Sequence, residues 1–234
     1  MPGWIYPKRG HVMILLEKRI GRTRDSVIWI DAVNKRVYRR VVAGMQWPGP
    51  RPGFAVIVGE EDNEDPFLHE NHIHVINEAD GVNIPGRDAL GFMRRLSELR
   101  GLYGIESIYG NPNIKSMQSM LSHFNDTLPD KGRNGIHIES ARLIDDKRCF
   151  DFCVQIVRKR LVEGRKTLHL GKESSLPGIL AAAGEVMGAK AEDYPAIAAL
   201  GYAVGALDSW KPLKTPLPDR QATHYDMFSY QGRA

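Results

Sequence analysis

Residues 40–61, RVVAGMQWPGPRPGFAVIVGEE, predict two strands on either side of a turn. The first strand belongs to a run rich in Val and Arg, RVYRRVVAG, and the second is the continuous apolar run FAVIVGEE. Strands favour β-branched residues, and an unbroken apolar run of this length is typical of a buried strand. Residues 46–53, between the two runs, contain three prolines, which exclude a helix or a central strand there.

Further strands are predicted on both sides of this stretch. Upstream, HVMILLEKRI at residues 11–20 and SVIWIDAV at residues 26–33 are rich in Val and Ile. Downstream, HIHVINEAD at residues 72–80 is another strand, and the polar loop before it predicts an antiparallel hairpin with residues 54–61.

The apolar period then changes from that of strands to that of helices. Within residues 86–103, Leu90, Met93 and Leu96 recur at helical spacing. Short strands follow near residues 105–110 and 135–139, and they alternate with further helices, which are predicted at residues 113–128, 147–163, 174–188 and 192–208. Because strand–helix–strand units give parallel strands, the sequence predicts an α/β fold, with a mixed sheet that carries helices on both faces.

The last predicted helix, KAEDYPAIAALGYAVGAL at residues 190–207, opens with two adjacent acids, Glu192 and Asp193. Acids in a first turn complement the positive end of the helix dipole, so they are a common signal for a helix start. Carboxylates beside a sheet are also the oxygen ligands that divalent metal ions take. Both interpretations, a helix cap and a metal site, stay open at this point.

Composition is that of a globular rather than a disordered chain, with 42% hydrophobic and 26% charged residues. No run of 18 apolar residues is present, and the N-terminus lacks the apolar core of a signal peptide, so no membrane contact is expected. Cys149 and Cys153 stand four apart on a predicted helix, which favours free thiols in a reducing compartment over a metal pair. We therefore expect a cytoplasmic protein.

The net charge of +4 is unevenly distributed along the chain. Residues 1–53 hold eleven Lys or Arg and three acids, a balance of +8, whereas the remaining residues hold 21 and 25, a balance of −4. A basic segment of this kind predicts a polyanionic partner, most simply DNA. A solvated basic surface explains the same charges equally well.

Three segments, taken in order, resemble the nuclease domain of phage terminase large subunits, which has a ribonuclease H-like fold. RVVAGMQWPGPRPGFAVIVGEE resembles the family's strand, glycine-rich loop and second strand. Asp146-Lys147 and LVEGR at residues 161–165 resemble its next helix and basic turn, and Lys190-Ala191-Glu192-Asp193 resembles its closing helix. The resemblance spans about residues 40–208 and implies a ribonuclease H-like mixed sheet.

The chain is then expected to have three parts. Residues 1–40 form a basic N-terminal β segment, residues 41–210 form the ribonuclease H-like domain, and residues 211–234 form an irregular, proline-rich tail. No internal repeat or low-complexity segment suggests a different division.

In that family, carboxylates from different strands and from the last helix hold two metal ions that assist phosphodiester cleavage. The resemblance carries Asp193 and Glu192 over as catalytic, metal-binding acids, with Mg²⁺ or Mn²⁺ as the cofactor. The other two catalytic positions fall on neutral residues, Gln46 and Asn111. Amide oxygens can ligate Mg²⁺, but they add no negative charge to offset two cations.

Substitute acids stand at the ends of two predicted strands, namely Glu60, Glu61, Glu78 and Asp80. They are either metal ligands, with Glu60 and Glu78 the first candidates, or solubilising residues of the hairpin loop. No nucleotide cofactor is expected, because the chain has no G-x-x-x-x-G-K-[ST] phosphate loop.

Two functions follow from the resemblance. In the first, the chain is a terminase-nuclease-like domain of phage or prophage origin that binds DNA or a packaging protein and cleaves weakly or not at all. The alternative is an active Mg²⁺- or Mn²⁺-dependent endonuclease for phage DNA packaging that uses substitute acids. In both, four arginines of the basic segment are expected to contact DNA phosphates: Arg36, Arg39, Arg40 and Arg51.

The spacing His69-x-x-His72-x-His74 supports a separate hypothesis. His72 and His74 share a face if residues 72–80 form a strand, and imidazoles are ligands for zinc, copper or nickel. The favoured interpretation is that these are surface histidines of the hairpin.

Overall fold

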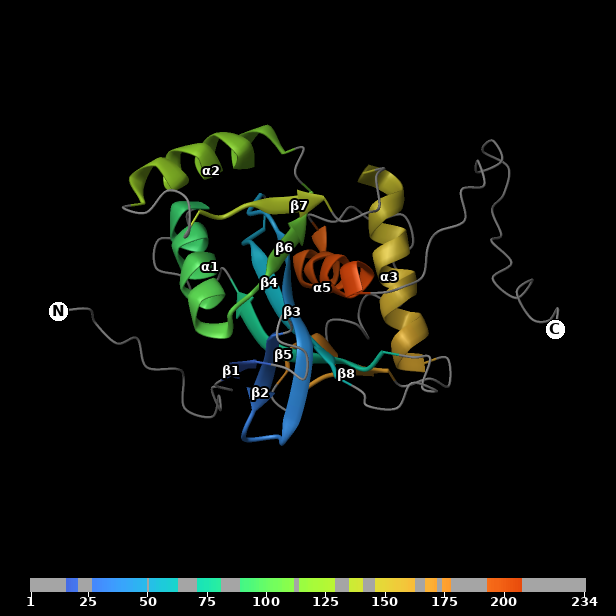
Figure 1. The fold of residues 1–234 in the computed structure, drawn as a ribbon. Coiled ribbons are helices and arrows are strands. Elements are labelled where there is room, and N and C mark those ends of the chain that lie inside the picture. Colours follow the sequence, from blue (N-terminus) through green and yellow to red (C-terminus); the bar gives the residue numbers. More distant parts are fainter. Residues whose placement is uncertain are drawn as a thin grey trace, which may run out of the picture.

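The computed structural model describes residues 16–20, 27–49, 51–62, 71–80, 89–111, 114–128, 135–140, 146–162, 167–171, 174–177 and 193–207. They form an α/β structure built on one eight-stranded sheet (Figure 1). The strands are β1 (Leu16–Ile20), β2 (Val27–Asp31), β3 (Arg36–Gln46), β4 (Phe54–Glu61), β5 (Ile73–Asp80), β6 (Ser107–Gly110), β7 (Ile138–Ser140) and β8 (Leu168–His169). The helices are α1 (Ala89–Tyr103), α2 (Lys115–Thr127), α3 (Asp146–Val162) and α5 (Pro195–Leu207).

β3 is the central strand of the sheet, and both of its edges are paired. β4 runs antiparallel to it from Tyr38 to Gln46. On the other edge, antiparallel β2 pairs with residues 36–38, and parallel β6 pairs with residues 42–44. With eleven residues, β3 is long enough to hold two different neighbours end to end.

The remaining strands extend the sheet on both sides of β3. β4 pairs antiparallel with β5, β5 pairs parallel with β8, and β6 pairs parallel with β7. Helices α1 and α2 precede β6 and β7 in the chain, and such helical connections are what parallel strands require. The predicted antiparallel pair and the predicted parallel strands are both confirmed.

Alternate residues of the central strands face two separate hydrophobic cores. Ala43 of β3 packs in one core with Leu96 of α1, and α2 contributes to the same core. Val42 of β3 packs in the other core with Val157 of α3 and Ala203 of α5. Because side chains alternate across a strand, this pattern puts helices on both faces of the sheet, as predicted (Figure 1).

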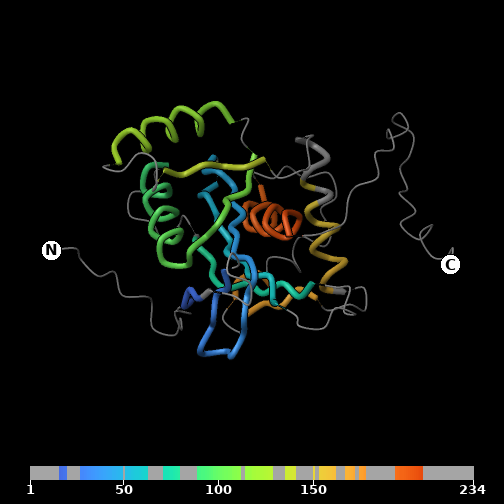
Figure 2. Tube along the Cα trace, in the orientation of Figure 1, coloured from blue at the N-terminus to red at the C-terminus, as the bar shows by residue number. Residues whose placement is uncertain are grey.

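Helix α5 is largely buried and lies directly on β3, between the sheet and α3 (Figure 2). A Cβ atom on Gly44 would lie 1.9 Å from the carbonyl oxygen of Ala199 and 2.7 Å from the amide nitrogen of Ala203. On the opposite side of the helix, a Cβ atom on Gly201 would lie 2.1 Å from the Cβ of Cys153 in α3. The small residues of α5 therefore allow backbone-to-backbone packing on one side and close helix packing on the other.

The last helix begins at Pro195, three residues later than predicted, and its first turn contains no acid. Proline favours the first helical position because the N–H that it lacks would have no partner there. The amides of Ile197 and Ala198 donate to the carbonyl oxygen of Tyr194, each at 3.1 Å. Asp193, which immediately precedes Tyr194, is exposed. Glu192 lies outside the described residues.

Other predictions concern the limits of the domain and its compartment. The boundary expected after residue 40 falls inside β3, and β1 and β2 belong to the same sheet as the later strands. Residues 211–234 and the side chain of Cys149 lie outside the described part, whereas Cys153 is buried. None of the helices that the structure describes has both the length and the apolar character needed to cross a membrane.

We expect Gly44→Ala to destabilise the protein strongly, because its methyl group would overlap backbone atoms of α5. Overpacking a core typically costs about 1–3 kcal/mol, and rigid neighbours favour the upper end of this range. The measurement is the free energy of unfolding in urea.

Gly101→Ala in α1 is the matched control, because no atom lies within 4 Å of the added Cβ. Replacing an exposed helical glycine by alanine should stabilise the protein by roughly 0.5–1 kcal/mol. Equal effects of the two substitutions would contradict the close contact between β3 and α5.

Candidate functional site

The positions matched to catalytic acids lie at one end of the sheet. Gln46 of β3 pairs with Phe54 of β4, and Phe54 pairs with Asp80 of β5, so these three backbones form a row across the sheet. β3 and β6 are parallel, and extending their register by two residues brings Asn111 beside Gln46. The row therefore contains both neutral residues that stand where the resemblance implies acids.

The start of α5 lies near the same end. The ring of Tyr194, just before α5, stacks on Phe150 of α3 with the centroids 5.8 Å apart. Tyr109 of β6 packs against the cluster that contains Phe150, and it is two residues from Asn111. Asp193 is therefore close to the end of β6, but its side chain is exposed, whereas Gln46 is only 6% exposed.

Glu60 and Glu61 lie at the opposite end of the sheet. They follow Phe54 by six and seven residues on β4, which is roughly 20 Å along the strand. Glu60 is buried and forms an ion pair with Arg39, and Glu61 binds His74 with an Oε2–Nε2 distance of 3.0 Å. The structure does not bring these two acids together with Gln46.

Glu78 is held by a loop rather than directed toward the row. Its carboxylate accepts hydrogen bonds from the hydroxyl groups of Ser174 and Ser175, the second at 2.6 Å, and from the Ser175 amide at 3.1 Å. The side chain of Asp80 lies outside the described residues. Across the part of the chain that the structure describes, no group of three His, Cys, Asp or Glu side chains is arranged to hold a metal ion.

The four arginines expected to contact DNA do not form one patch. Arg36, Arg39 and Arg40 stand near the start of β3, whereas Arg51 follows its far end and is exposed. The Arg39 side chain is 46% exposed although it pairs with Glu60. Arg36 and Arg40 are half-buried, so Arg39 and Arg51 are the most accessible of the four.

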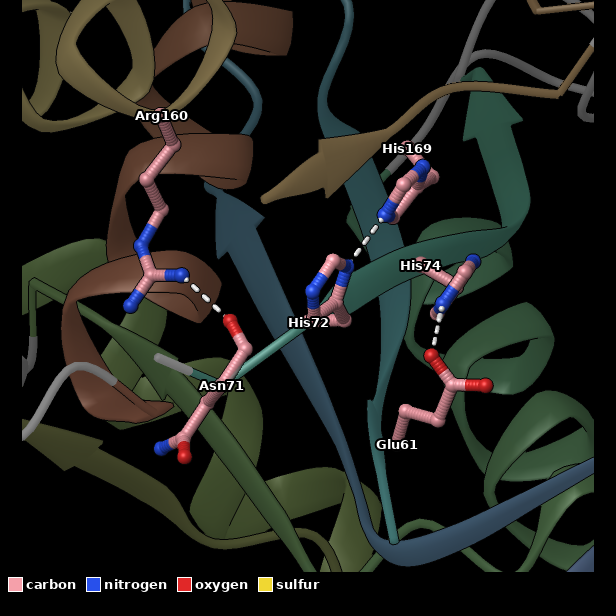
Figure 3. Close-up of polar contacts among 6 residues, drawn as sticks. All are labelled: Glu61, Asn71, His72, His74, Arg160 and His169. Atoms are coloured by element: carbon pink, nitrogen blue, oxygen red, sulfur yellow. Dashed lines mark hydrogen bonds and ion pairs between the residues drawn. The ribbon is translucent and has the colours of Figure 1, made fainter. Parts of the chain in front are cut away.

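A group of polar side chains that the sequence did not predict lies where β5 and β8 meet. Ile73 and His74 of β5 pair with Leu168 and His169 of β8 in parallel register. His72, which precedes β5, joins them, so three imidazoles come together from residues far apart in the chain. We call these three residues, with Glu61, the histidine cluster (Figure 3).

The rings of the histidine cluster stack on one another. The His169 ring is 4.3 Å from that of His74, at 10° between the planes, and 5.1 Å from that of His72, at 15°. His72 Nδ1 and His169 Nε2 are hydrogen-bonded at 2.8 Å, and Figure 3 shows His169 reaching from β8 toward the rings of His72 and His74. The expectation of surface histidines is wrong for His74, which is only 4% exposed. His69 lies outside the described residues.

The hydrogen-bond partners indicate which ring nitrogens of the histidine cluster carry a proton. An ionised Glu61 carboxylate only accepts, so His74 donates from Nε2. His74 Nδ1 is then an unprotonated nitrogen, and it is buried without a hydrogen-bond partner. Between His72 Nδ1 and His169 Nε2, one nitrogen donates and the other accepts, so one proton lies between these two nitrogens.

The surroundings favour neutral imidazoles. Burial lowers the pKa of His74 to about 4, against the opposing hydrogen bond of Glu61 and with help from the positive Arg36. Burial also lowers the pKa of His169, and His72 and Arg36 lower it further. The lone pair of a ring nitrogen lies in the plane of its ring. Because these rings are stacked in nearly parallel planes, their lone pairs do not point to one common metal ion.

Arg160 of α3 holds the backbones beside the cluster. Its guanidinium donates to the carbonyl oxygen of Asn71 at 2.8 Å (Figure 3). It also donates to the Thr167 hydroxyl at 3.2 Å. The Thr167 carbonyl in turn accepts from the amide of Ile73 at 2.8 Å. These hydrogen bonds therefore link the end of α3 to the joint between β5 and β8.

Comparisons of the chain with protein-family models, with curated proteins and with solved structures found no match. Function is therefore inferred from the strand order, from the row at Gln46 and from the histidine cluster. His169 was missed as a site residue because its partner strand β5 lies far away in the chain and no local pattern identifies that pairing. The only signal was the alternation Thr167-Leu168-His169-Leu170, which matches the alternation of residues 72–75.

We expect the free energy of unfolding to fall as the pH is lowered from 7.5 to 5. The unfolded chain takes up a proton at His74 near the ordinary pKa of 6.5, whereas the folded chain resists it down to about 4. The contribution of His74 to the free energy of unfolding is therefore complete above pH 6.5 and is lost progressively below it. At pH 5 this loss amounts to about 2 kcal/mol. Urea unfolding at a series of pH values measures the loss.

His74→Gln should remove much of this pH dependence, whatever it does to stability at pH 7.5. His123→Gln, an exposed change on α2, is the control and should keep the wild-type dependence. Parallel curves for wild type and His74→Gln would show that His74 is not the titrating group.

Proposed function

We propose that the chain is a ribonuclease H-like domain of the terminase nuclease type, of phage or prophage origin, which binds DNA and cleaves it weakly or not at all. The order β5-β4-β3-β6-β7 supports the fold assignment. It combines three antiparallel strands with two parallel strands that follow helices, as a ribonuclease H-like sheet does. The closing helix α5, packed over the central strand, agrees with the same assignment.

The proposal of low activity rests on Gln46 and Asn111, the neutral residues of the row at the end of β3. Two divalent ions at close range need carboxylates to offset their charge and to stabilise the attacking and leaving oxygens. Gln46 and Asn111 supply oxygen atoms without charge. The structure describes three of the matched positions, Gln46, Asn111 and Asp193, and among these Asp193 alone is an acid. A site of this composition is expected to bind Mg²⁺ or Mn²⁺ weakly.

The alternative, an active endonuclease with substitute acids, receives little support from the acids at strand ends. Glu60, Glu61 and Glu78 are engaged by Arg39, His74 and two serines, respectively. Asp80 is different, because its backbone lies in the same row as Gln46. An active enzyme would therefore need Asp80 as its first substitute ligand.

We expect the wild-type chain to bind Mn²⁺ weakly and to leave plasmid DNA largely uncut. Gln46→Asp combined with Asn111→Asp should tighten Mn²⁺ binding at least tenfold, about 1.4 kcal/mol, because two negative charges enter one row. Isothermal titration calorimetry measures the affinity, and gel analysis of plasmid measures cleavage.

Gln118→Asp on the exposed surface of α2 is the matched control, since it also converts an amide to an acid but lies outside the row. It should leave Mn²⁺ binding unchanged. Efficient cutting by the wild type, abolished by Asp193→Asn, would instead establish the alternative, and Asp80→Asn would then be the next variant to measure.

We expect DNA binding to weaken steeply with salt, because phosphate contacts release counterions. Each lost contact should reduce the slope of log K against log salt by about 0.9 for duplex DNA. Arg40→Ala and Arg51→Ala are the variants to compare by fluorescence anisotropy. Arg39→Ala is less suitable, since it would leave the buried Glu60 carboxylate without its partner.

Arg95→Ala is the control for this experiment. Arg95 is an exposed arginine of α1 that pairs with Glu98 and lies outside the basic segment. Binding that does not depend on salt, or an equal loss of slope in Arg95→Ala, would count against DNA contact through the basic segment.

A further inference from the structure

We propose that the histidine cluster is a proton-operated latch, which holds β8 and the end of α3 against β5 while its imidazoles are neutral. Uptake of protons by the cluster releases β8 from β5. The latch rests on the stacked geometry at the joint of the two strands, and it is independent of the proposed nuclease ancestry.

The backbone contribution to this joint is small. β8 has only two residues, which pair with Ile73 and His74 of β5. One further backbone hydrogen bond, from the Ile73 amide to the Thr167 carbonyl, precedes them. So short a ladder is weak, and the side chains of His72, His74 and His169 therefore supply a large part of the attachment.

The hydrogen bond between His72 and His169 requires one of its two facing nitrogens to be unprotonated. Their Nδ1 and Nε2 atoms are 2.8 Å apart, so one of them must act as an acceptor. A proton on the accepting nitrogen makes both facing nitrogens donors, so the hydrogen bond is lost and the contact becomes repulsive. Moving β8 away from β5 removes this repulsion.

His74 opposes protonation in the closed state for a separate reason. A proton on its buried Nδ1 would meet no acceptor, and the added charge would stack against His169 at 4.3 Å. Once β8 moves away, water can solvate this nitrogen. The open form thus accepts protons that the closed form excludes.

The charges around the cluster do not compensate for added protons. Arg36 of β3 is positive and lowers the pKa of both His74 and His169. Glu61 of β4 is the opposing negative charge, and it is already bound to His74. Tyr38 of β3 adds no negative charge, since burial raises its already high pKa to about 12.

Release of β8 would reach beyond the strand itself. Leu168 of β8 is buried in the same core as Val157 of α3. Arg160 ties the end of α3 to Asn71 and Thr167, on the two sides of the joint. Opening therefore exposes apolar surface beside α3 and loosens the end of that helix, while the pairing of β3 with β4 remains intact.

Hydrogen–deuterium exchange with mass spectrometry tests the latch on the full-length chain. After correction for intrinsic exchange rates, protection of the peptides covering residues 71–76 and 160–170 should fall about tenfold per pH unit between pH 6.5 and 5, for one extra proton in the open form. At pH 5 these peptides should exchange fully while peptides covering residues 41–46 and 54–58 stay protected. Simultaneous loss of protection in both sets, or no pH dependence at 71–76 and 160–170, would overturn the proposal.

Two variants separate the latch from a general effect of acid. In His169→Gln and in His72→Gln, glutamine can hydrogen-bond but cannot take up a proton, so the pH dependence of these peptides should fall by at least half on a logarithmic scale. His123→Gln should keep the wild-type dependence. If both cluster variants also keep it, the histidines do not operate the joint.

Discussion

The contact between Gly44 of β3 and the backbone of α5 is the constraint on which the arrangement of the sheet and its helices depends. With a Cβ at that position only 1.9 Å from the Ala199 carbonyl oxygen, strand and helix approach as closely as main chains allow. This approach fixes the height of α5 above the sheet, and Gly201 extends the same close packing to α3. The end of β3 is consequently held against the middle of α5, two residues before Gln46.

Local patterns predicted most of the strands and helices, because each such pattern is contained in its own segment. The apolar run at residues 54–61 and the helical spacing at residues 86–103 gave a strand and a helix at nearly the predicted limits. Pairings between distant segments had no comparable signal. β8 joins β5 across about ninety residues, and its two residues are too few for any period to be recognised.

The candidate sites show the same difference between local and long-range information. The proximity of Gln46 and Asn111 could be predicted, because parallel strands bring their ends to one edge of a sheet. The acids Glu60 and Glu61 could not be assigned from their position at a strand end alone. Successive side chains of a strand point to opposite faces, so Glu60 meets Arg39 on one face and Glu61 meets His74 on the other. Those partners come from other strands and are not the residues directly opposite in the register, so only the three-dimensional structure identifies them.

The two ends of the sheet hold buried polar groups in physically different ways. At the row, Gln46 carries no charge at any ordinary pH, so it can be buried without a metal ion to neutralise a carboxylate. At the opposite end, burial and Arg36 lower the pKa of His74 and of His169, so these two imidazoles are uncharged at neutral pH. The burial of Gln46 does not depend on pH, whereas the protonation of His74 and His169 does. The groups that respond to pH therefore lie at the joint between β5 and β8, where His74 and His169 meet, and not at Gln46.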